Sequence, residues 1–405
     1  MVPSLLVSSW MWHLTRWNGL FLGTYLVTHL GGPPIANQFV GVAMFAPMLA
    51  GAYFSGRSGI DPRAMVFRTQ LALLPVAVLM TVVVSTGAVS LWMVYPFELA
   101  YGFGGMVNMT AQRELLFRVG GPLRAGRVLN IEVTSMAAAI MLGPLLGGLT
   151  ISAFGLGVAF AVPAVLLAGS VVLFWMSTRR LPVYPMLKVA ALPVRQGTDW
   201  RLLSRSPALA LILLVTVICN LCYFAFLPLV PVIAEHLNAG AAMAGVIGAA
   251  AGVSQLVVAT GLVVRPVRRP LGAYVGGVAL CLSCLGIVAA TPLLSVTLAA
   301  LGVAGIGQAL FGSTQATLPV AAVGIHERTV ALGLLSTTIG LALPTGMVIL
   351  GVTSSVLGPQ RAMLVSALAG LVTLAATLLV GRRFLTGPTL DEAAGGGGEG
   401  DSVAA

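Results

Sequence analysis

Stretches apolar and long enough to cross a lipid bilayer follow one another along almost the whole chain. About twelve can be distinguished, each near the twenty residues that a helix needs to span the hydrocarbon core. Backbone polar groups in lipid must be satisfied within the segment, so each stretch is predicted to be an α-helix. Hydrophobic residues make up 58% of the 405 and charged residues 8%, which excludes a soluble globular fold. The stretches lie near 9–30, 36–56, 69–87, 90–111, 128–152, 157–178, 207–234, 240–263, 270–291, 294–320, 330–356 and 362–381.

The net charge of +10 comes from Lys and Arg residues that cluster in alternate loops. Such clusters mark the cytoplasmic side of a membrane protein, and they predict a multi-pass protein of the cell (plasma) membrane with both termini in the cytoplasm. Arg361 is the clear exception. The charge therefore gives no reason to expect a nucleic-acid partner. The basic loop residues are Arg57, Arg63, Arg68, Arg113, Arg118, Arg124, Arg127, Arg179, Arg180, Lys188, Arg195, Arg201, Arg205, Arg265, Arg268, Arg269, Arg328, Arg382 and Arg383.

The chain also contains an internal repeat, because residues 102–155 align without a gap on residues 305–358. Six predicted helices separate the copies, and an even number keeps the two halves parallel. We expect an N-terminal six-helix half (1–178), a cytoplasmic linker (179–206), a C-terminal six-helix half (207–385) and a disordered tail (386–405). The glycines coincide at 102/305, 104/307, 121/324, 143/346, 148/351 and 155/358, and Gln112 coincides with Gln315.

The segment RAGRVLNIEVTSMAAAIMLGPLLGGLTISAFG (124–155) resembles the fourth loop and fifth helix of major facilitator exporters. Its Gly143-Pro144-x-x-Gly147-Gly148 is similar to the glycine–proline signature of drug/proton antiporters. HLTRWNGLFLG (13–23) is similar to the first helix of the enterobactin-exporter-like branch.

This resemblance implies an all-α membrane protein of the major facilitator fold, with twelve transmembrane helices in two parallel six-helix repeats. It implies a functional monomer that exports a small amphipathic organic molecule (a drug, secondary metabolite or siderophore) in exchange for protons by alternating access. An uptake permease of the same fold and a transport-inactive membrane sensor or scaffold are the alternatives.

Strongly polar residues concentrate in predicted helices 1, 4, 7 and 10, whereas the interiors of predicted helices 3, 6, 9 and 12 lack His, Asn, Gln and charged residues. Such groups are costly in lipid and should face protein or a wet cavity. In the family these four helices line the central cavity, so the resemblance assigns their polar residues to the substrate. The predicted cavity residues are His13, Arg16, Asn18, Asn108, Asn220, Tyr223, Gln308 and Gln315. His13 and Arg16 could instead reach the inner headgroups.

Two acids within predicted spans are candidates for proton coupling. Glu98 stands where the exporters carry an arginine, four residues before Gly102-Phe103-Gly104. Desolvation penalises an ionised carboxyl at that depth, which suits a proton carrier and equally suits a neutral, hydrogen-bonded structural acid. Glu132 follows Arg127 by five residues, so a structural ion pair at the inner mouth competes there with proton carriage.

Glycines and a proline interrupt predicted helix 5. Without a hydrophobic drive between helices in lipid, close contact depends on small residues, and a proline can bend a helix at the joint. Tight packing without motion is the alternative. The predicted packing and hinge residues are Gly143, Pro144, Gly147, Gly148, Gly346 and Gly351.

The loop after predicted helix 2, GAYFSGRSGIDPR (51–63), keeps Gly51, Arg57 and Gly59 of a family loop that we assign to gating. Ser55 and Gly56 replace its acid and arginine, which supports the transport-inactive alternative.

Two Cys-x-x-Cys pairs, 219/222 and 281/284, would indicate zinc on soluble loops. Both lie in apolar stretches, where small apolar packing residues are expected instead. The sequence contains no Walker loop, no metal-binding histidine pair and no nucleophile elbow. We therefore predict no metal, no cofactor and no enzymatic activity.

Overall fold

The computed structural model describes residues 2–50, 61–120, 125–181, 200–265, 267–315, 317–324 and 327–385. Every regular element in these ranges is a helix, and they contain no β-strand. In chain order the elements are α1 (Val2–His29), α2 (Pro34–Phe45), η1 (Ala46–Ala50), α4 (Pro62–Ser85), η2 (Leu91–Met93), α5 (Val94–Gly120), α6 (Ala125–Thr178), α7 (Arg201–Arg205), α8 (Pro207–Ile218), η4 (Cys219–Tyr223), η5 (Phe224–Leu229), α9 (Val230–His236), α10 (Ala241–Val264), α11 (Pro270–Ala290), α12 (Leu294–Gln315), α13 (Thr317–Ala321), α14 (Arg328–Leu357) and α15 (Pro359–Leu385).

Eight helical segments in the described part of the chain are long and apolar enough to cross a membrane. One of them, Thr134–Thr178, contains two predicted spans because α6 turns sharply at Gly155. Helices α1 and α5 have 28 and 27 residues, but polar side chains in their interiors lower their hydropathy. Together with α2 and η1, these segments match the twelve predicted spans.

Gly155 and Gly358 occupy equivalent positions in the two repeats and share one unusual backbone conformation. Their φ angles are 83° and 81°, a left-handed region that residues with a Cβ rarely adopt. Gly155 joins the two arms of α6, and Gly358 separates α14 from α15. The repeat therefore preserves the sharp connection between its fifth and sixth helices.

The chain forms two compact units. Unit 1 consists of Met1–Leu192, Phe226–Gly252 and Met347–Pro359, and unit 2 consists of Pro193–Ala225, Val253–Gly346 and Gln360–Ala405. Unit 1 thus contains the predicted N-terminal half together with two segments from the predicted C-terminal half. The predicted boundaries of the halves remain an expectation from the sequence repeat.

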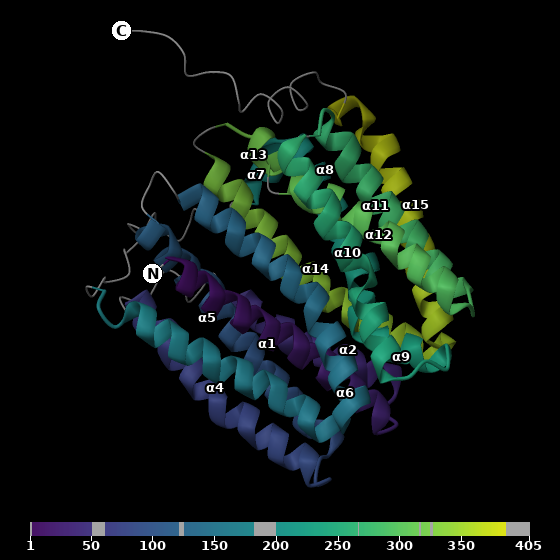
Figure 1. Cartoon of the computed structure of the whole chain (residues 1–405). Helices are drawn as coiled ribbons and strands as arrows, with labels where there is room; N and C mark the ends of the chain where they lie inside the picture. Colours follow the sequence, from purple (N-terminus) through teal and green to yellow (C-terminus); the bar gives the residue numbers. More distant parts are fainter. Residues whose placement is uncertain are drawn as a thin grey trace. The chain divides into compact units, whose positions relative to one another are not determined.

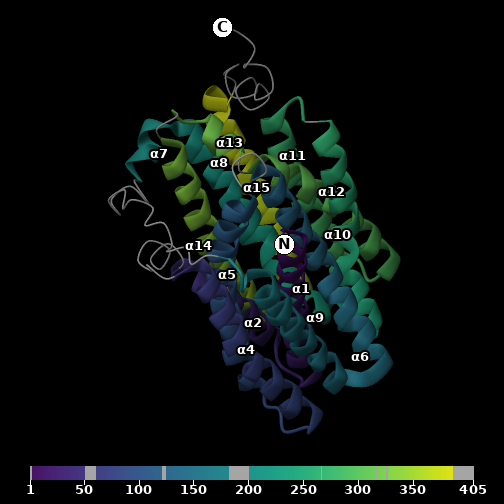
Figure 2. The same cartoon turned by 60° about the vertical axis from the view of Figure 1, so that its left-hand side comes forward.

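In unit 1, helix α1 packs along both arms of α6, and α4 packs against α5 and α6 (Figures 1 and 2). A buried apolar cluster joins these four helices, with Leu5, Val66, Leu115 and Phe174 among its members. Asp61 caps α4 by accepting from the backbone N–H of Arg63 at 3.0 Å, and Pro62 occupies the first turn. These start signals place the beginning of α4 seven residues before the predicted stretch.

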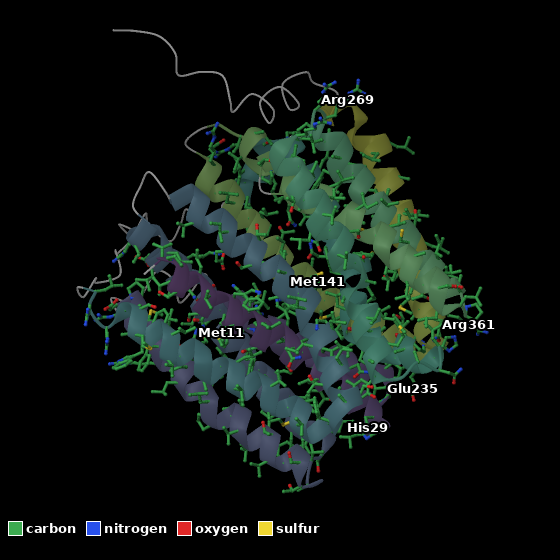
Figure 3. All side chains as sticks on the ribbon, viewed as in Figure 1. Met11, His29, Met141, Glu235, Arg269 and Arg361 are labelled. Carbon is green, nitrogen blue, oxygen red and sulfur yellow. The ribbon has the colours of Figure 1, made fainter. Side chains whose placement is uncertain are left out.

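In unit 2, helices α11 and α12 lie side by side in both views (Figures 1 and 2). The helical path from Pro207 to His236 is irregular, because α8 passes into the π-helix η4 and then into the 3₁₀-helix η5. Arg269 and Arg361 lie at opposite ends of this unit (Figure 3). That placement agrees with Arg361 being the exception to the loop-charge pattern.

Candidate functional site

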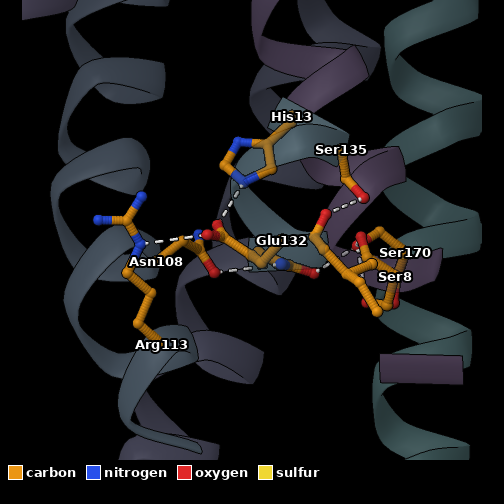
Figure 4. Close-up of polar contacts among 9 residues, drawn as sticks. Ser8, His13, Asn108, Arg113, Glu132, Ser135 and Ser170 are labelled. Carbon is orange, nitrogen blue, oxygen red and sulfur yellow. Dashed lines mark hydrogen bonds and ion pairs between the residues drawn. The ribbon is translucent and has the colours of Figure 1, made fainter. Parts of the chain in front are cut away.

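Glu132 of α6 holds together three helices of unit 1. Its side chain is buried, with His13 Nε2 of α1 lying 3.0 Å from one carboxylate oxygen. Arg113 of α5 donates through Nε to the other oxygen at 3.2 Å (Figure 4). The predicted partner was Arg127, whose side chain lies outside the described residues. The two partners that the structure describes come from α1 and α5.

A second set of buried, hydrogen-bonded polar side chains connects α1, α4, α5 and the later arm of α6 (Figure 4). Gln70 donates to Asn108 Oδ1 at 3.1 Å and accepts from the Ser170 hydroxyl at 3.0 Å, while the Ser8 hydroxyl donates to the Ser170 carbonyl. Asn108 also donates to the Gly104 carbonyl at 2.9 Å. The expectation that helix 3 has no interior Asn or Gln is wrong. The Asp61-Pro62 start signal would have placed Gln70 inside the helix.

Glu98 of α5 is fully buried, and neither carboxylate oxygen has a hydrogen-bond partner among the described residues. The carboxyl lies against the backbone of α1, where a Cβ on Gly23 would be 2.8 Å from Glu98 Oε1. The neighbouring Tyr101 is also fully buried, and no described residue forms a hydrogen bond with its hydroxyl. Ionisation of a buried carboxyl is costly when no donor stabilises the charge. The negative charge is therefore less favourable on Glu98 than on Glu132, which has two hydrogen-bond partners.

Arg16 of α1 is 6% exposed, and its Nε and Nη2 atoms have no hydrogen-bond partner among the described residues. The guanidinium carbon lies 5.6 Å from the centre of the Phe45 ring. Asn18, two residues further along α1, donates to the Gly143 carbonyl of α6 at 2.9 Å. The structure therefore places Arg16 and Asn18 within unit 1, where Asn18 bridges two helices and two guanidinium nitrogens of Arg16 lack a hydrogen-bond partner among the described residues.

The polar residues predicted for the C-terminal half lie in unit 2. Gln308 of α12 donates to the Tyr223 hydroxyl at 2.8 Å, and Asn220 donates to the Thr216 carbonyl at 2.9 Å. Gln315 is partly buried near the end of α12. Asn220 and Tyr223 belong to the π-helix η4, a distortion that is frequent at functional sites.

The four cysteines are free thiols buried in unit 2. Within the described residues, no group of three or more His, Cys, Asp or Glu side chains is placed to hold a metal ion. The predicted gating residues Gly51, Arg57 and Gly59 lie outside the described residues.

The predicted packing glycines of α6 face two different helices. A Cβ on Gly143 would lie 2.7 Å from the backbone N of Asn18, and one on Gly147 would meet Phe21 of the same helix. A Cβ on Gly148 would instead meet the Ala241 carbonyl and lie 2.8 Å from the Gly245 Cα, both on α10. Helix α6 therefore contacts α1 and α10 almost backbone to backbone.

The equivalent glycines of the second repeat make equivalent contacts. A Cβ on Gly346 would lie 2.7 Å from the Cα of Leu221, and one on Gly351 would lie 3.1 Å from the side chains of Ile35 and Gln38. The offset of 203 that relates Gly143 to Gly346 also relates Asn18 to Leu221. Likewise, the offset that relates Gly148 to Gly351 relates Gln38 to Ala241. Tertiary contacts thus reproduce the repeat found in the sequence.

A bundle of membrane-length helices with buried polar and charged side chains is typical of proteins that carry polar groups or solutes through a membrane. The sequence matches the model of the Major Facilitator Superfamily over residues 5–322, and the chain belongs to this family. The all-α major facilitator fold is thereby confirmed. No curated protein sequence matches the chain.

Solved transporter structures have the same fold at low sequence identity. A bacterial homolog of the human lysosomal transporter Spinster, in an inward-facing and unoccupied conformation, has a TM-score of 0.71 at 14% identity, covering 95% of this chain and 96% of that chain. The nucleoside transporter NupG has a TM-score of 0.68 at 13% identity, covering 93% and 98%. An auto-inhibited POT family peptide transporter has a TM-score of 0.68 at 14% identity, covering 94% and 96%.

Proposed function

We propose that this chain is a proton-coupled exporter of a small amphipathic organic molecule that works by alternating access in the cell membrane. The observation that carries proton coupling is Glu98. Its carboxyl is fully buried beside α1, and no hydrogen-bond donor contacts it in the described part of the chain. Ionisation in such a place is costly, so a conformational change that wets or covers the carboxyl would release or take up a proton.

The glycine contacts support alternating access. Helix α6 meets α10 through Gly148 and Gly245, and α14 meets α2 at Gly351. Contacts that involve glycine lack interlocking side chains, so the helices can separate and rejoin with little repacking. Glu132, with its two partners, is better suited to hold α1, α5 and α6 together than to carry the proton alone.

Export is supported by the resemblance of Gly143-Pro144-x-x-Gly147-Gly148 to the signature of drug/proton antiporters. The solved relatives named above include a nucleoside transporter and a peptide transporter, and at 13–14% identity they support the fold alone. The direction of transport is therefore the quantity that the experiment measures.

The test uses inside-out and right-side-out membrane vesicles that contain equal amounts of the protein. The candidate substrates are fluorescent amphipathic compounds such as Hoechst 33342 and metabolites extracted from cells that naturally make the protein. An exporter accumulates its substrate in inside-out vesicles, and an uncoupler abolishes that accumulation. Accumulation with ATP in the presence of the uncoupler would contradict proton coupling. Accumulation confined to right-side-out vesicles would identify an uptake permease, and none in either orientation would support the transport-inactive alternative.

A further inference from the structure

Arg16 is a buried cation whose hydrogen-bonding capacity is largely unused. It lies in the interior of α1, is 6% exposed, and has two guanidinium nitrogens without partners among the described residues. The ion pairs of the described residues involve Arg63, Arg113, Arg118 and His13, and none involves Arg16. Proteins normally pair a buried charge and satisfy its donors, so this site lacks an acceptor.

The surroundings of Arg16 are shaped around the guanidinium. A Cβ on Gly105 of α5 would lie 2.7 Å from both Cζ and Nε of Arg16, so a residue with a side chain at 105 would displace the group. The centre of the Phe45 ring lies 5.6 Å from Cζ of Arg16. The Trp17 ring lies next to the Phe45 ring, with 6.1 Å between the two ring centres. An aromatic face and a bare backbone hold the guanidinium without using its N–H donors.

Glu98 is the acid whose charge acts on Arg16, but neither oxygen of its carboxyl makes a hydrogen bond or an ion pair with the guanidinium. Seven residues separate Glu98 from Gly105, which corresponds to about 10 Å along α5. The Glu98 carboxyl is placed beside Gly19 and Gly23 of α1, whereas the guanidinium is placed beside Gly105. Glu132 is already paired with His13 and Arg113. The described part of the chain therefore supplies no acceptor to Arg16 in this conformation.

We propose that Arg16 binds an acidic group of the transported molecule, so that the substrate is an amphipathic organic acid carrying a carboxylate, sulfonate or phosphate. The planar guanidinium can donate two parallel hydrogen bonds to such a group. The Phe45 and Trp17 rings beside it suit an apolar or aromatic body attached to the acid. This inference rests on the proposed transport function and adds the chemical class of the substrate.

The experiment measures binding of two probes of nearly the same shape, 1-naphthoate and 1-naphthamide, to the purified full-length protein in a non-ionic detergent. We expect the wild type to bind the acid about tenfold more tightly than the amide, since hydrogen bonds between charged groups are the stronger kind. Arg16→Gln should abolish this preference while 1-naphthamide binding persists, which shows that the variant is folded. Arg16→Lys should keep part of the preference, because it retains the charge but not the paired donors.

The matched control is Arg68→Gln, which removes the same charge from an exposed position on α4 and should leave the preference unchanged. Sulfate should raise the thermal midpoint of the wild type but not that of Arg16→Gln. An equal preference for the acid in Arg16→Gln, or no preference in the wild type, would overturn the assignment. Loss of stability to the same extent in Arg16→Gln and Glu98→Gln, without acid preference, would identify Glu98 as the true partner.

Two further results separate this inference from the proposed function. Acid preference that depends on Arg16, without gradient-driven transport, would overturn the transport function and leave the anion site standing. Gradient-driven transport of neutral and cationic compounds with no preference for acids would overturn the anion site alone. Displacement of 1-naphthoate by phosphatidylglycerol but not by phosphate would assign the anion to a lipid headgroup and overturn the assignment to the substrate.

Discussion

At the scale of single residues, the two buried acids of unit 1 have different surroundings. Glu132 accepts from Arg113 and is hydrogen-bonded to His13, so its charge is compensated within the protein. Glu98 is equally buried, but none of the described residues donates a hydrogen bond to it. A carboxylate with partners is a structural group, whereas one without them is sensitive to any change in its surroundings.

The residue-scale prediction concerns Glu98→Gln. The amide keeps the shape of the side chain but cannot titrate, so proton-driven transport should be lost. Exchange of labelled for unlabelled substrate across the membrane needs no proton and should continue. Both are measured in proteoliposomes with and without an imposed pH gradient.

Glu114→Gln is the control for this variant, because Glu114 is only partly buried and is paired with Arg118 on the same helix. It should transport like the wild type. Undiminished pH-driven transport by Glu98→Gln would transfer the coupling role to Glu132 or His13.

At the scale of helices, close contacts with neighbouring helices explain why the apolar helix α6 contains several glycines and a proline. Gly143 and Gly147 allow α1 to approach, and Gly148 allows α10 to approach. Pro144 lies on the α10 side, where its carbonyl oxygen is 2.6 Å from a Cβ placed on Gly245. An apolar helix can therefore contain many glycines and a proline when neighbouring helices contact its backbone directly.

The helix-scale prediction is that Gly148→Val reaches the membrane normally but transports poorly. Valine adds apolar surface that lipid accepts, yet its side chain would collide with the backbone of α10, which cannot rotate away. Overpacking costs about 1–3 kcal/mol, which corresponds to a roughly five- to 150-fold loss of the conformation that needs this contact. Transport per unit of inserted protein is the quantity to measure.

Gly351→Val should be milder than Gly148→Val, because a Cβ there meets the side chains of Ile35 and Gln38 at 3.1 Å and side chains can shift. The sequence repeat alone predicts that the two variants lose transport equally, whereas the contacts in the structure predict a larger loss for Gly148→Val. Gly302→Val on α12 is the matched control, since no atom of another described helix lies within 4 Å of its Cβ position. Full transport by Gly148→Val would mean that the contact is not used during the cycle.

At the scale of the whole molecule, the repeat is visible in both sequence and contacts. The offset of 203 residues relates the glycines, their partners and the left-handed residues Gly155 and Gly358. Two copies of one helical unit, separated by an even number of spans, must have the same orientation in the membrane. The charged loops then decide which side faces the cytoplasm.

The whole-molecule prediction concerns topology. Reporter fusions after Leu203 and after the C-terminal residue should both report the cytoplasm, whereas a fusion after Gly87 should report the outside. A cytoplasmic reporter such as green fluorescent protein, paired with a periplasmic one such as alkaline phosphatase, distinguishes the sides. An external signal after Leu203 or at the C-terminus would contradict the twelve-span arrangement.

Apolar length and charge placement determine the class, the number of spans and the repeat by themselves, because the bilayer imposes a helix on each stretch whatever its neighbours are. The break at Gly155 was also predicted, since it acts locally, whereas the predicted third helix began seven residues after the Asp61-Pro62 start signal. The tertiary structure decided which polar groups meet. Glu132 meets His13 and Arg113 from two other helices, Gln70 joins Asn108, and no hydrogen bond joins Arg16 to Glu98. These outcomes depend on how each helix is rotated against the next, and local spacing does not encode that rotation.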